Sequence, residues 1–296
     1  MITVKDVWHS FDTNVVLEDV NFVAKDANVL GLVGINGSGK STLLRVLSGV
    51  YQIQHGEVLY EDRSPADADV RKDIFLLPDD PYFTNQSTCR NLLDLYKMLY
   101  PQFDANTYKE IISYFRLDPN KPIRSFSKGM RRQTFIALAF AVGPKYMLLD
   151  EAFDGLDPLA RNAFKQRITE MVKEKGSTVI VSSHALKELA DFCNEYLLID
   201  RKHVIYSENI IKENAKVFKY QLIFKDGVDS SKFEGIKARS VQIVGIVATV
   251  IMEGNEEEVK AKLQALSPDI MERIDVNFEE AFIGERGRFQ GGGVVR

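Results

Sequence analysis

A glycine-rich stretch, residues 29–49 (VLGLVGINGSGKSTLLRVLSG), has the residue types and spacing of a polyphosphate site. Gly34 is followed by four residues and then by Gly39, Lys40 and Ser41, which is the spacing of a P-loop. Glycines let successive backbone N–H groups turn toward a phosphate, and a following helix adds its positive end. Lys40 can reach the β and γ phosphates, and Ser41 can offer a hydroxyl to Mg²⁺. The alternative is a purely structural glycine turn.

Two adjacent acids follow a later apolar run. The stretch YMLLDEAFDGLDP, residues 146–158, begins as a buried strand and continues with Asp150 and Glu151. Ligands of open parallel sheets bind at the carboxyl ends of the strands. We therefore expect Asp150 to hold Mg²⁺ through water and Glu151 to polarise the attacking water as a general base. A solvated strand end is the alternative for such a pair.

A third apolar run, STVIVSSHA, ends in His184. A histidine just after a buried strand is often a structural hydrogen-bonding residue. Beside a P-loop and an acid pair, its ring N–H can instead donate to a γ-phosphate.

These groups need strands and helices that bring them together. The apolar residues before Gly34 predict a strand, and Leu43, Leu44 and Leu47 predict a helix that ends at Gly49. The segment 79–125 contains two amphipathic helical patterns separated by a proline. The pattern of strand, loop and helix is the context that a P-loop requires.

Length and composition narrow the class of protein. The chain has 296 residues, of which 45% are hydrophobic and 27% charged, and this favours a soluble globular protein with one large and one smaller domain. The formal net charge of -4 argues against nucleic-acid binding. Cys89 and Cys193 lie far apart and are expected to be free thiols in a reducing compartment. The start MITVKDVWHSF does not resemble a signal peptide, and every apolar run falls short of the ~20 residues of a membrane span.

The motifs together resemble a known family. In order, the chain shows Phe11, GINGSGKST, LLPDD, SFSKGM, YMLLDE, GLDP and SSH. This series is similar to the ATP-binding subunit of an ABC transporter over residues 1 to about 210. The resemblance implies an α/β fold: a P-loop ATPase core with an antiparallel β subdomain and a helical subdomain. It also implies that Phe11 stacks on adenine; a role in the core is the alternative.

SFSKGM, which contains Ser127 and Gly129, resembles the signature motif of that family. Ser127 is a good N-cap, and the N–H groups of the first helical turn attract an anion. The resemblance implies that this helix end faces the γ-phosphate of ATP bound by a second copy, so that two ATP molecules lie between two subunits. A cap without that contact is the alternative. Lys128 and Met130 depart from the commonest family pattern, and we expect Lys128, Arg131 and Arg132 to form a solvated basic face.

The resemblance also assigns the site residue by residue. Asp79 stands where the family usually has a metal-contacting glutamine, and either a metal contact through water or a plain turn fits it. The expected catalytic residues are Glu151, His184 and Lys40, and the expected metal ligands are Ser41, Asp79 and Asp150. The expected ATP-binding residues are Phe11, Asn36, Gly37, Ser38, Gly39, Lys40, Ser41, Thr42, Ser127 and Gly129.

Two domains are expected. Residues 1–212 form the nucleotide-binding domain, with the helical subdomain at about 80–140, and residues 213–296 form an accessory α/β domain with a flexible tail. In the latter, FKYQLIFK and VQIVGIVATVIM read as strands, and NEEEVKAKLQAL reads as a helix capped by Asn255. NFEEAFIG, residues 277–284, is similar to the closing helix of exporter-type subunits.

The expected function is ATP hydrolysis coupled to transport. The chain would form a homodimer around two ATP·Mg²⁺ and drive separate integral membrane permease subunits, in bacterial export, from the cytoplasmic face of the membrane. One alternative is a soluble ABC-type ATPase that acts on ribosomes or nucleic acid, although the acidic charge balance disfavours phosphate tracking. Another is a scaffold that binds ATP without turnover.

Overall fold

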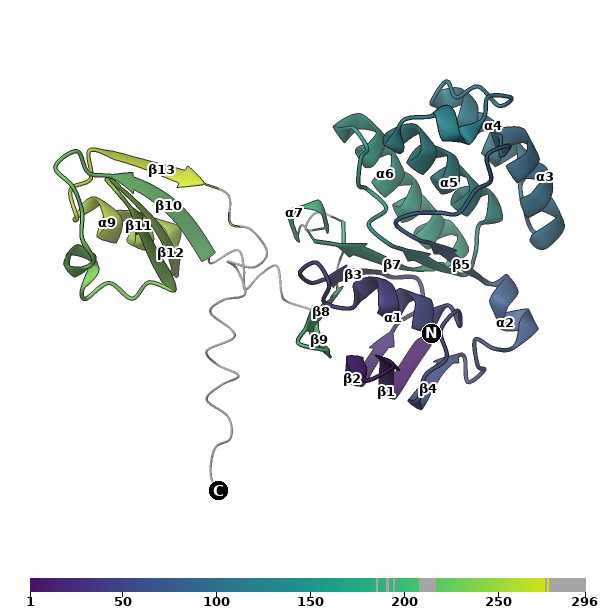
Figure 1. Ribbon diagram of the computed structural model, residues 1–296, viewed down its shortest axis with the longest axis horizontal. Coiled ribbons are helices and arrows are strands. Elements are labelled where there is room, and N and C mark those ends of the chain that lie inside the picture. Colours follow the sequence, from purple (N-terminus) through teal and green to yellow (C-terminus); the bar gives the residue numbers. More distant parts are fainter. Residues whose placement is uncertain (185, 190–191, 194, 208–216, 275, 277–296) are drawn as a thin grey trace. The chain divides into compact units, whose positions relative to one another are not determined.

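The computed structural model describes residues 1–184, 186–189, 192–193, 195–207, 217–274 and 276. The chain divides into two compact units, Met1–Glu208 and Asn209–Arg296, which we describe separately (Figure 1). The boundary expected at 212, the exporter-like segment 277–284 and the tail lie outside the described residues.

A six-stranded sheet forms the centre of the first unit. Its order is β5 (Ile74–Leu77), β6 (Tyr146–Leu149), β7 (Thr178–Ser183), β3 (Val29–Val33), β8 (Glu195–Asp200) and β9 (His203–Ser207). The first five strands run parallel, and β9 is antiparallel to β8. Parallel strands covered on both faces are apolar throughout, as in VLGLV and YMLL. Because the strands are parallel, β3, β6 and β7 end at one edge, where the P-loop, the acid pair and His184 follow them.

A smaller antiparallel sheet lies in the same unit. Its order is β2 (Asn14–Ala24), β1 (Ile2–Phe11) and β4 (His55–Tyr60), and α1 (Lys40–Leu47) lies between it and the six-stranded sheet (Figure 1). The apolar face of α1 packs into one core with residues of both sheets, which include Val4, Leu17, Leu30 and Ile180. The Tyr60 hydroxyl donates to the Leu47 carbonyl at 2.8 Å, and burial raises the pKa of this phenol above its usual value. This packing fixes the helix that carries the P-loop.

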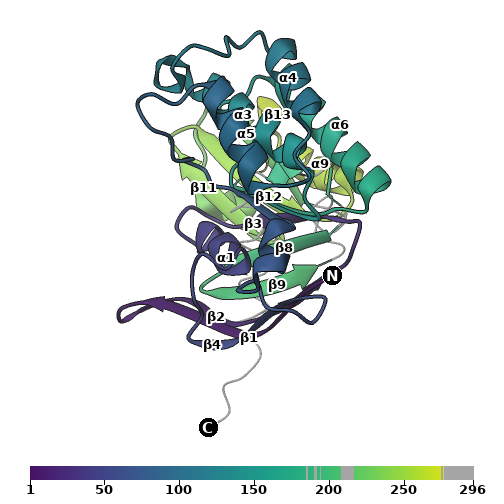
Figure 2. The same cartoon turned by 90° about the vertical axis from the view of Figure 1, so that its right-hand side faces the viewer.

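The helical part lies on the opposite side of the six-stranded sheet from α1 (Figures 1 and 2). It contains α3 (Cys89–Leu99), α4 (Ala105–Tyr114), α5 (Lys128–Val142) and α6 (Pro158–Lys175). Three shorter helices are α2 (Ala68–Lys72), which packs into the core of α1 through Val70, η1 (Ile123–Ser125) and α7 (Leu186–Leu189). A Thr88 capping box begins α3, and α5 ends at Gly143 with φ of 53°. Among the residues that the structure describes, no helix combines the length and apolar character needed to span a bilayer.

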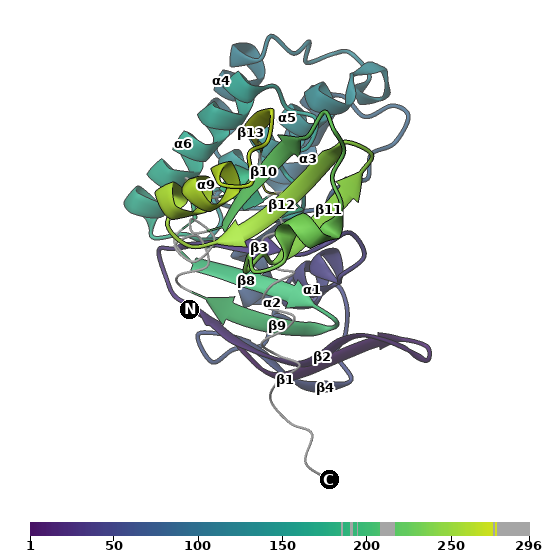
Figure 3. The same cartoon turned by 90° about the vertical axis from the view of Figure 1, so that its left-hand side faces the viewer.

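The second unit is an antiparallel sheet with one helix. The strand order is β11 (Ser240–Val244), β12 (Val247–Glu253), β10 (Val217–Ile223) and β13 (Ile270–Ile274) (Figure 3); the unit also contains η2 (Ser230–Phe233) and α9 (Glu256–Gln264). Asn255 caps α9 as expected, and Val259 and Leu263 pack against the sheet. The run VQIVGIVATVIM forms two strands, because Gly245 with φ of 63° turns the chain between β11 and β12.

Candidate functional site

The P-loop joins β3 to α1, and its shape depends on glycine. Gly37 and Gly39 have φ of 77° and 111°, which side chains with a Cβ rarely adopt. At Gly34 a Cβ would lie 2.5 Å from the Ser38 hydroxyl, so the loop also needs the small residue there for space. Gly39 is the N-cap of α1, and the first N–H groups of that helix therefore face the loop.

Lys40 is buried in this loop. Its ammonium donates to the carbonyl oxygens of Gly34 at 2.8 Å and Ile35 at 3.2 Å, and it lies 3.4 Å from Glu151 Oε1. A single lysine thus connects the P-loop to the acid pair that follows β6. Of the other expected ATP-binding residues here, Asn36 and Gly37 are exposed at the tip, Gly39 is buried, and Ser38, Ser41 and Thr42 are partly buried.

The acid pair is held by a serine from the neighbouring strand. Asp150 is 2% exposed, and its Oδ1 accepts a hydrogen bond from the Ser182 hydroxyl at 2.7 Å. The same hydroxyl oxygen accepts the Glu151 N–H at 2.9 Å, and the Asp150 N–H donates to the Leu77 carbonyl at 2.8 Å. Ser182 was not among the site residues predicted from the sequence. The signal was a small polar side chain directly after the apolar run Val179–Val181, in the strand beside the acid strand.

Glu151 has an unusual backbone that directs its side chain toward His184. Its φ of 46° lies in the left-handed region, where residues other than glycine are uncommon. The His184 Nδ1–H donates to Glu151 Oε2 at 3.1 Å, and Asp154 lies near both side chains. The structure therefore brings Lys40, Asp150, Glu151 and His184 together at one edge of the sheet.

The Ser127 helix end lies against the segment that follows the acid pair. Ser127 caps α5 by accepting the Met130 N–H at 3.2 Å. A Cβ at Gly129 would lie 2.6 Å from the Gly155 carbonyl oxygen, so only glycine permits this approach. The Lys128 ammonium pairs with Asp154 at 3.1 Å. Ser127 is exposed and Gly129 partly exposed, so this helix end is accessible to a ligand or partner.

Asp79 has a partner that the sequence analysis did not predict. Arg132 is 2% exposed, and its guanidinium donates to Asp79 Oδ1 at 2.7 Å, to the Asp79 carbonyl at 2.6 Å and to the Pro78 carbonyl at 2.9 Å. The Arg131 guanidinium donates to the carbonyls of Phe126 and Arg124. The expectation of a solvated basic face is therefore wrong for Arg132, which points inward toward the loop after β5.

Phe11 belongs to a group of three aromatic rings at the end of β1. It is 44% exposed and stands nearly perpendicular to His9 and Tyr51, with ring centroids 4.9 and 5.4 Å away. His9 and Tyr51 stack on each other with an interplanar angle of 4°. The His9 Nδ1–H donates to the Gln52 carbonyl at 2.9 Å. These contacts hold Phe11 while part of its ring stays available to a base.

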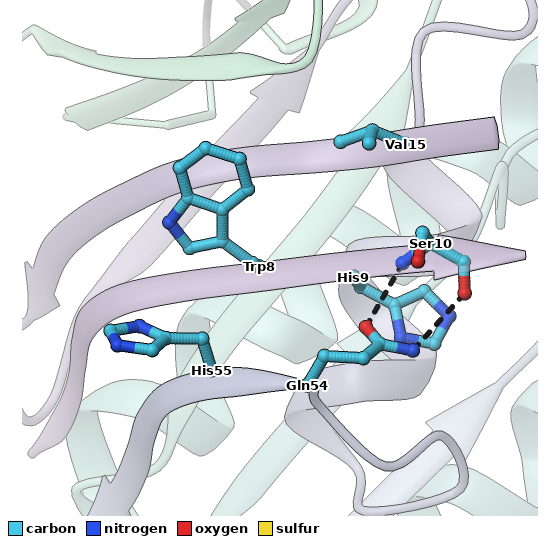
Figure 4. A pocket seen from close by; sticks show the side chains of 6 residues that line it. All are labelled: Trp8, His9, Ser10, Val15, Gln54 and His55. Atoms are coloured by element: carbon cyan, nitrogen blue, oxygen red, sulfur yellow. Dashed lines mark hydrogen bonds between the residues drawn. The ribbon is translucent and has the colours of Figure 1, made fainter. Parts of the chain in front are cut away.

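A hollow at the antiparallel sheet is lined by Trp8, His9, Ser10, Val15, Gln54 and His55 (Figure 4). The Gln54 amide accepts the Ser10 N–H at 3.0 Å and donates to the Ser10 carbonyl at 3.2 Å. The Gln54 side chain thus continues the pairing of the sheet where β1 approaches its end. The hollow does not include the residues expected to bind phosphate.

The groups at the sheet edge fit a triphosphate with Mg²⁺. The Ser38 hydroxyl is buried and has no hydrogen-bond partner among the described residues, as expected for a group that awaits a ligand oxygen. Ser41 and Asp150 supply the hydroxyl and carboxylate oxygens that Mg²⁺ prefers. The fold and these groups define the class: an α/β protein with the P-loop architecture of nucleotide-hydrolysing enzymes.

Comparison with known proteins identifies the family. Residues 17–154 match the family model described as ABC transporter. The ABC-type transporter ATP-binding protein EcsA of Bacillus subtilis (strain 168) is 30% identical over 213 residues, which are 69% of this chain and 85% of EcsA. The ABC transporter ATP-binding protein YtrB of the same strain is 27% identical over 291 residues, or 97% of this chain and 98% of YtrB. The chain belongs to the ABC transporter ATP-binding family and is an ATPase of that class.

Solved structures agree with the fold. The ATP-binding subunit of an ABC transporter superposes with a TM-score of 0.66 at 28% identity, over 73% of this chain and 93% of that subunit. The ATP-binding cassette MJ0796, in a dimeric post-hydrolysis state with ADP and phosphate, gives a TM-score of 0.62 at 21% identity, over 70% of this chain and 98% of the cassette. The resemblance and the α/β fold inferred from sequence are both confirmed.

Proposed function

We propose that this chain binds ATP with Mg²⁺, hydrolyses it, and forms an ATP-dependent homodimer that drives separate integral membrane subunits in export. One observation carries the proposal: the P-loop lysine, the acid pair and His184 converge at a single edge of the sheet, with Lys40 and His184 both in contact with Glu151. Membership of the ABC family supports coupling to transport.

The side chains divide the chemistry among them. The P-loop N–H groups and Lys40 bind the β and γ phosphates, and Phe11 stacks on adenine. Glu151 accepts a proton from the attacking water. The His184 ring N–H, which donates to Glu151 in this structure, donates to the γ-phosphate once ATP is bound. Ser41 and Asp150 would hold Mg²⁺, which would neutralise charge on the phosphates. Because Ser182 holds both Asp150 and the Glu151 backbone, the two carboxylates keep their separate roles.

The proposed dimer uses the Ser127 helix end. This end is exposed, and the N–H groups of a first helical turn have no partner within the helix, so it can face a γ-phosphate bound by the second copy. Asp157, which caps α6 through the Ala160 N–H at 2.9 Å, is proposed to lie at the dimer seam. The dimeric state of the MJ0796 cassette supports a dimer, and the place of Ser127 and Asp157 in it is part of the proposal.

The membrane partners are proposed to dock on the helical subdomain. On α3, Met98 is 80% exposed and Leu99 is 56% exposed, which is an apolar surface suited to a cytoplasmic helix of a permease. The chain would then lie on the cytoplasmic face of the membrane through these subunits. The direction of export rests on the exporter-like sequence 277–284.

Turnover and assembly test this function. Purified wild-type chain is expected to hydrolyse ATP in the presence of Mg²⁺, and Glu151→Gln to lose about 10²- to 10⁴-fold of that rate while it still binds ATP. With ATP, Glu151→Gln should elute as a dimer in size-exclusion chromatography. Equal low turnover in both proteins would favour a scaffold. Affinity purification from cells that recovers ribosomes or DNA instead of integral membrane proteins would contradict the transporter role.

A further inference from the structure

Arg132 is a deeply buried charged side chain five positions after Ser127. It lies in the second turn of α5 and is 2% exposed, whereas its partner Asp79 is 51% exposed. Its three hydrogen bonds to Pro78 and Asp79 use two carbonyl oxygens and one carboxylate oxygen. A planar guanidinium can donate to all three oxygen atoms at once. A lysine ammonium cannot reproduce this forked geometry.

These contacts connect two parts of the proposed site within one chain. The Asp150 N–H donates to the Leu77 carbonyl, and Pro78 and Asp79 follow directly. Arg132 then joins this loop to α5, whose first residues follow Ser127. The path runs from the metal-site carboxylate, through the loop after β5, to the helix end that would meet the second copy.

An ion pair that joins α5 to the segment after β6 is weaker. Lys128 pairs with Asp154, but the two side chains are 64% and 39% exposed. Exposed ion pairs contribute little to stability, whereas a buried guanidinium without its partners is strongly unfavourable. Arg132 is therefore a buried polar contact that restricts the position of α5 relative to the loop after β5, beside the aromatic contact of Phe83 with Phe135.

We infer that Arg132, with the Asp79 carboxylate as its partner, is a positioning residue that holds the Ser127 helix end in the orientation required for ATP-dependent dimerisation. This inference rests on the proposed ATP-dependent dimer. Arg132 acts through α5 and does not itself contact nucleotide. Its loss therefore weakens assembly of two ATP-loaded chains more than it weakens ATP binding by one chain.

The test uses Arg132→Lys in the full chain with Glu151→Gln, so that the dimer accumulates. The ATP concentration for half-maximal dimer formation, measured by sedimentation, is expected to rise about tenfold or more. ATP affinity is measured separately by calorimetry in a Ser127→Arg chain, which is expected to stay monomeric. There Arg132→Lys should change the dissociation constant by less than about twofold. Equal losses in both measurements would indicate a general loss of structure and overturn the inference.

A matched control and a double-mutant cycle sharpen the result. Arg167→Lys makes the same change on α6, where Arg167 pairs with Glu110 at the surface, and should leave dimerisation unchanged. As a single substitution, Asp79→Asn should weaken dimerisation. Combined with Arg132→Lys it should weaken dimerisation little further, because the two residues act as a unit. Additive effects would show that Asp79 acts independently, as a metal contact would, and would overturn the inference. A Glu151→Gln parent that stays monomeric with ATP overturns the proposed dimer as well, whereas an undisturbed Arg132→Lys dimer overturns this inference alone.

Discussion

A single hydroxyl determines how the two carboxylates after β6 are presented. Ser182 donates to Asp150 and accepts from the Glu151 backbone, where φ is 46°. The bond to the backbone N–H helps to hold Glu151 in this uncommon conformation, which would otherwise cost about 1–3 kcal/mol. Ser182 is not proposed to take part in the reaction itself. It acts by orienting the two carboxylates.

Ser182→Ala is expected to lower ATP turnover about 10- to 100-fold, the usual cost of removing a group that orients a metal ligand. Steady-state kinetics with Mg²⁺ measures the change. Ser177→Ala is the matched control, because Ser177 is equally buried and its hydroxyl donates to the Pro144 carbonyl away from the site. If both variants lose activity to the same extent, Ser182 has only a structural role.

Phe11→Ala is expected to weaken ATP binding by about 1–3 kcal/mol, since stacking of a base on an aromatic ring contributes that amount. Phe11→Tyr keeps the ring and should bind ATP nearly as well as the wild type. Calorimetry with a Glu151→Gln chain measures both. Unchanged affinity in Phe11→Ala would show that the ring serves the contacts with His9 and Tyr51 instead of the nucleotide.

At the scale of elements, the Ser127 end of α5 carries the proposed contact between copies. Ser127→Arg is expected to bind ATP with nearly unchanged affinity but to stay monomeric, because a large side chain would occupy the place of the phosphate. Size-exclusion chromatography with ATP, against Glu151→Gln as the dimeric reference, checks this. A Ser127→Arg, Glu151→Gln chain that forms as much dimer as Glu151→Gln would contradict the assignment.

The start of α4 gives a prediction for stability. Asp104 caps this helix, and hydrogen bonds from the Thr107 hydroxyl and the Asn106 N–H hold the pKa of its carboxyl below the usual value. Its contribution is therefore present at neutral pH and is lost as the pH falls from the unfolded pKa through the lowered folded pKa. Asp104→Ala should lower the free energy of unfolding by about 1 kcal/mol at pH 7.

Asp104→Asn is the control for that experiment, because asparagine keeps the cap but does not titrate. Urea unfolding at several pH values should show a smaller loss of stability on the acid side for Asp104→Asn than for the wild type. The same acid dependence in both proteins would mean that other carboxyl groups dominate.

Apolar periodicity was sufficient to predict the elements around the site. The runs before Gly34, Asp150 and His184 are strands, and their parallel pairing explains why residues so far apart in sequence meet. The hairpin at Gly245 was less clear, because a single glycine interrupts a continuous apolar run. The inward position of Arg132 was not predicted. Its partners lie more than fifty positions away in sequence, and two of them are backbone carbonyls, which leave no signal in the sequence.

At the scale of the whole molecule, assembly makes thermal stability depend on concentration. If ATP joins two copies, a tenfold increase in Glu151→Gln concentration should raise the Tm with ATP, because binding that favours only the folded dimer stabilises it by mass action. Ser127→Arg at the same concentrations is the control and should show no such rise. Scanning calorimetry measures both, and a Tm independent of concentration would argue against a dimer joined by nucleotide.

The contacts of Lys40 affect the rate at which nucleotide binds. Its ammonium already has two carbonyl oxygens and a carboxylate nearby, so these groups satisfy one another before any triphosphate arrives. The phosphate oxygens of ATP then replace the oxygen atoms that already surround Lys40. The P-loop backbone does not have to become ordered on binding, because the entropic cost of ordering it belongs to folding. Rapid-mixing measurements should therefore show one concentration-dependent association phase, without a slow rearrangement that limits its rate.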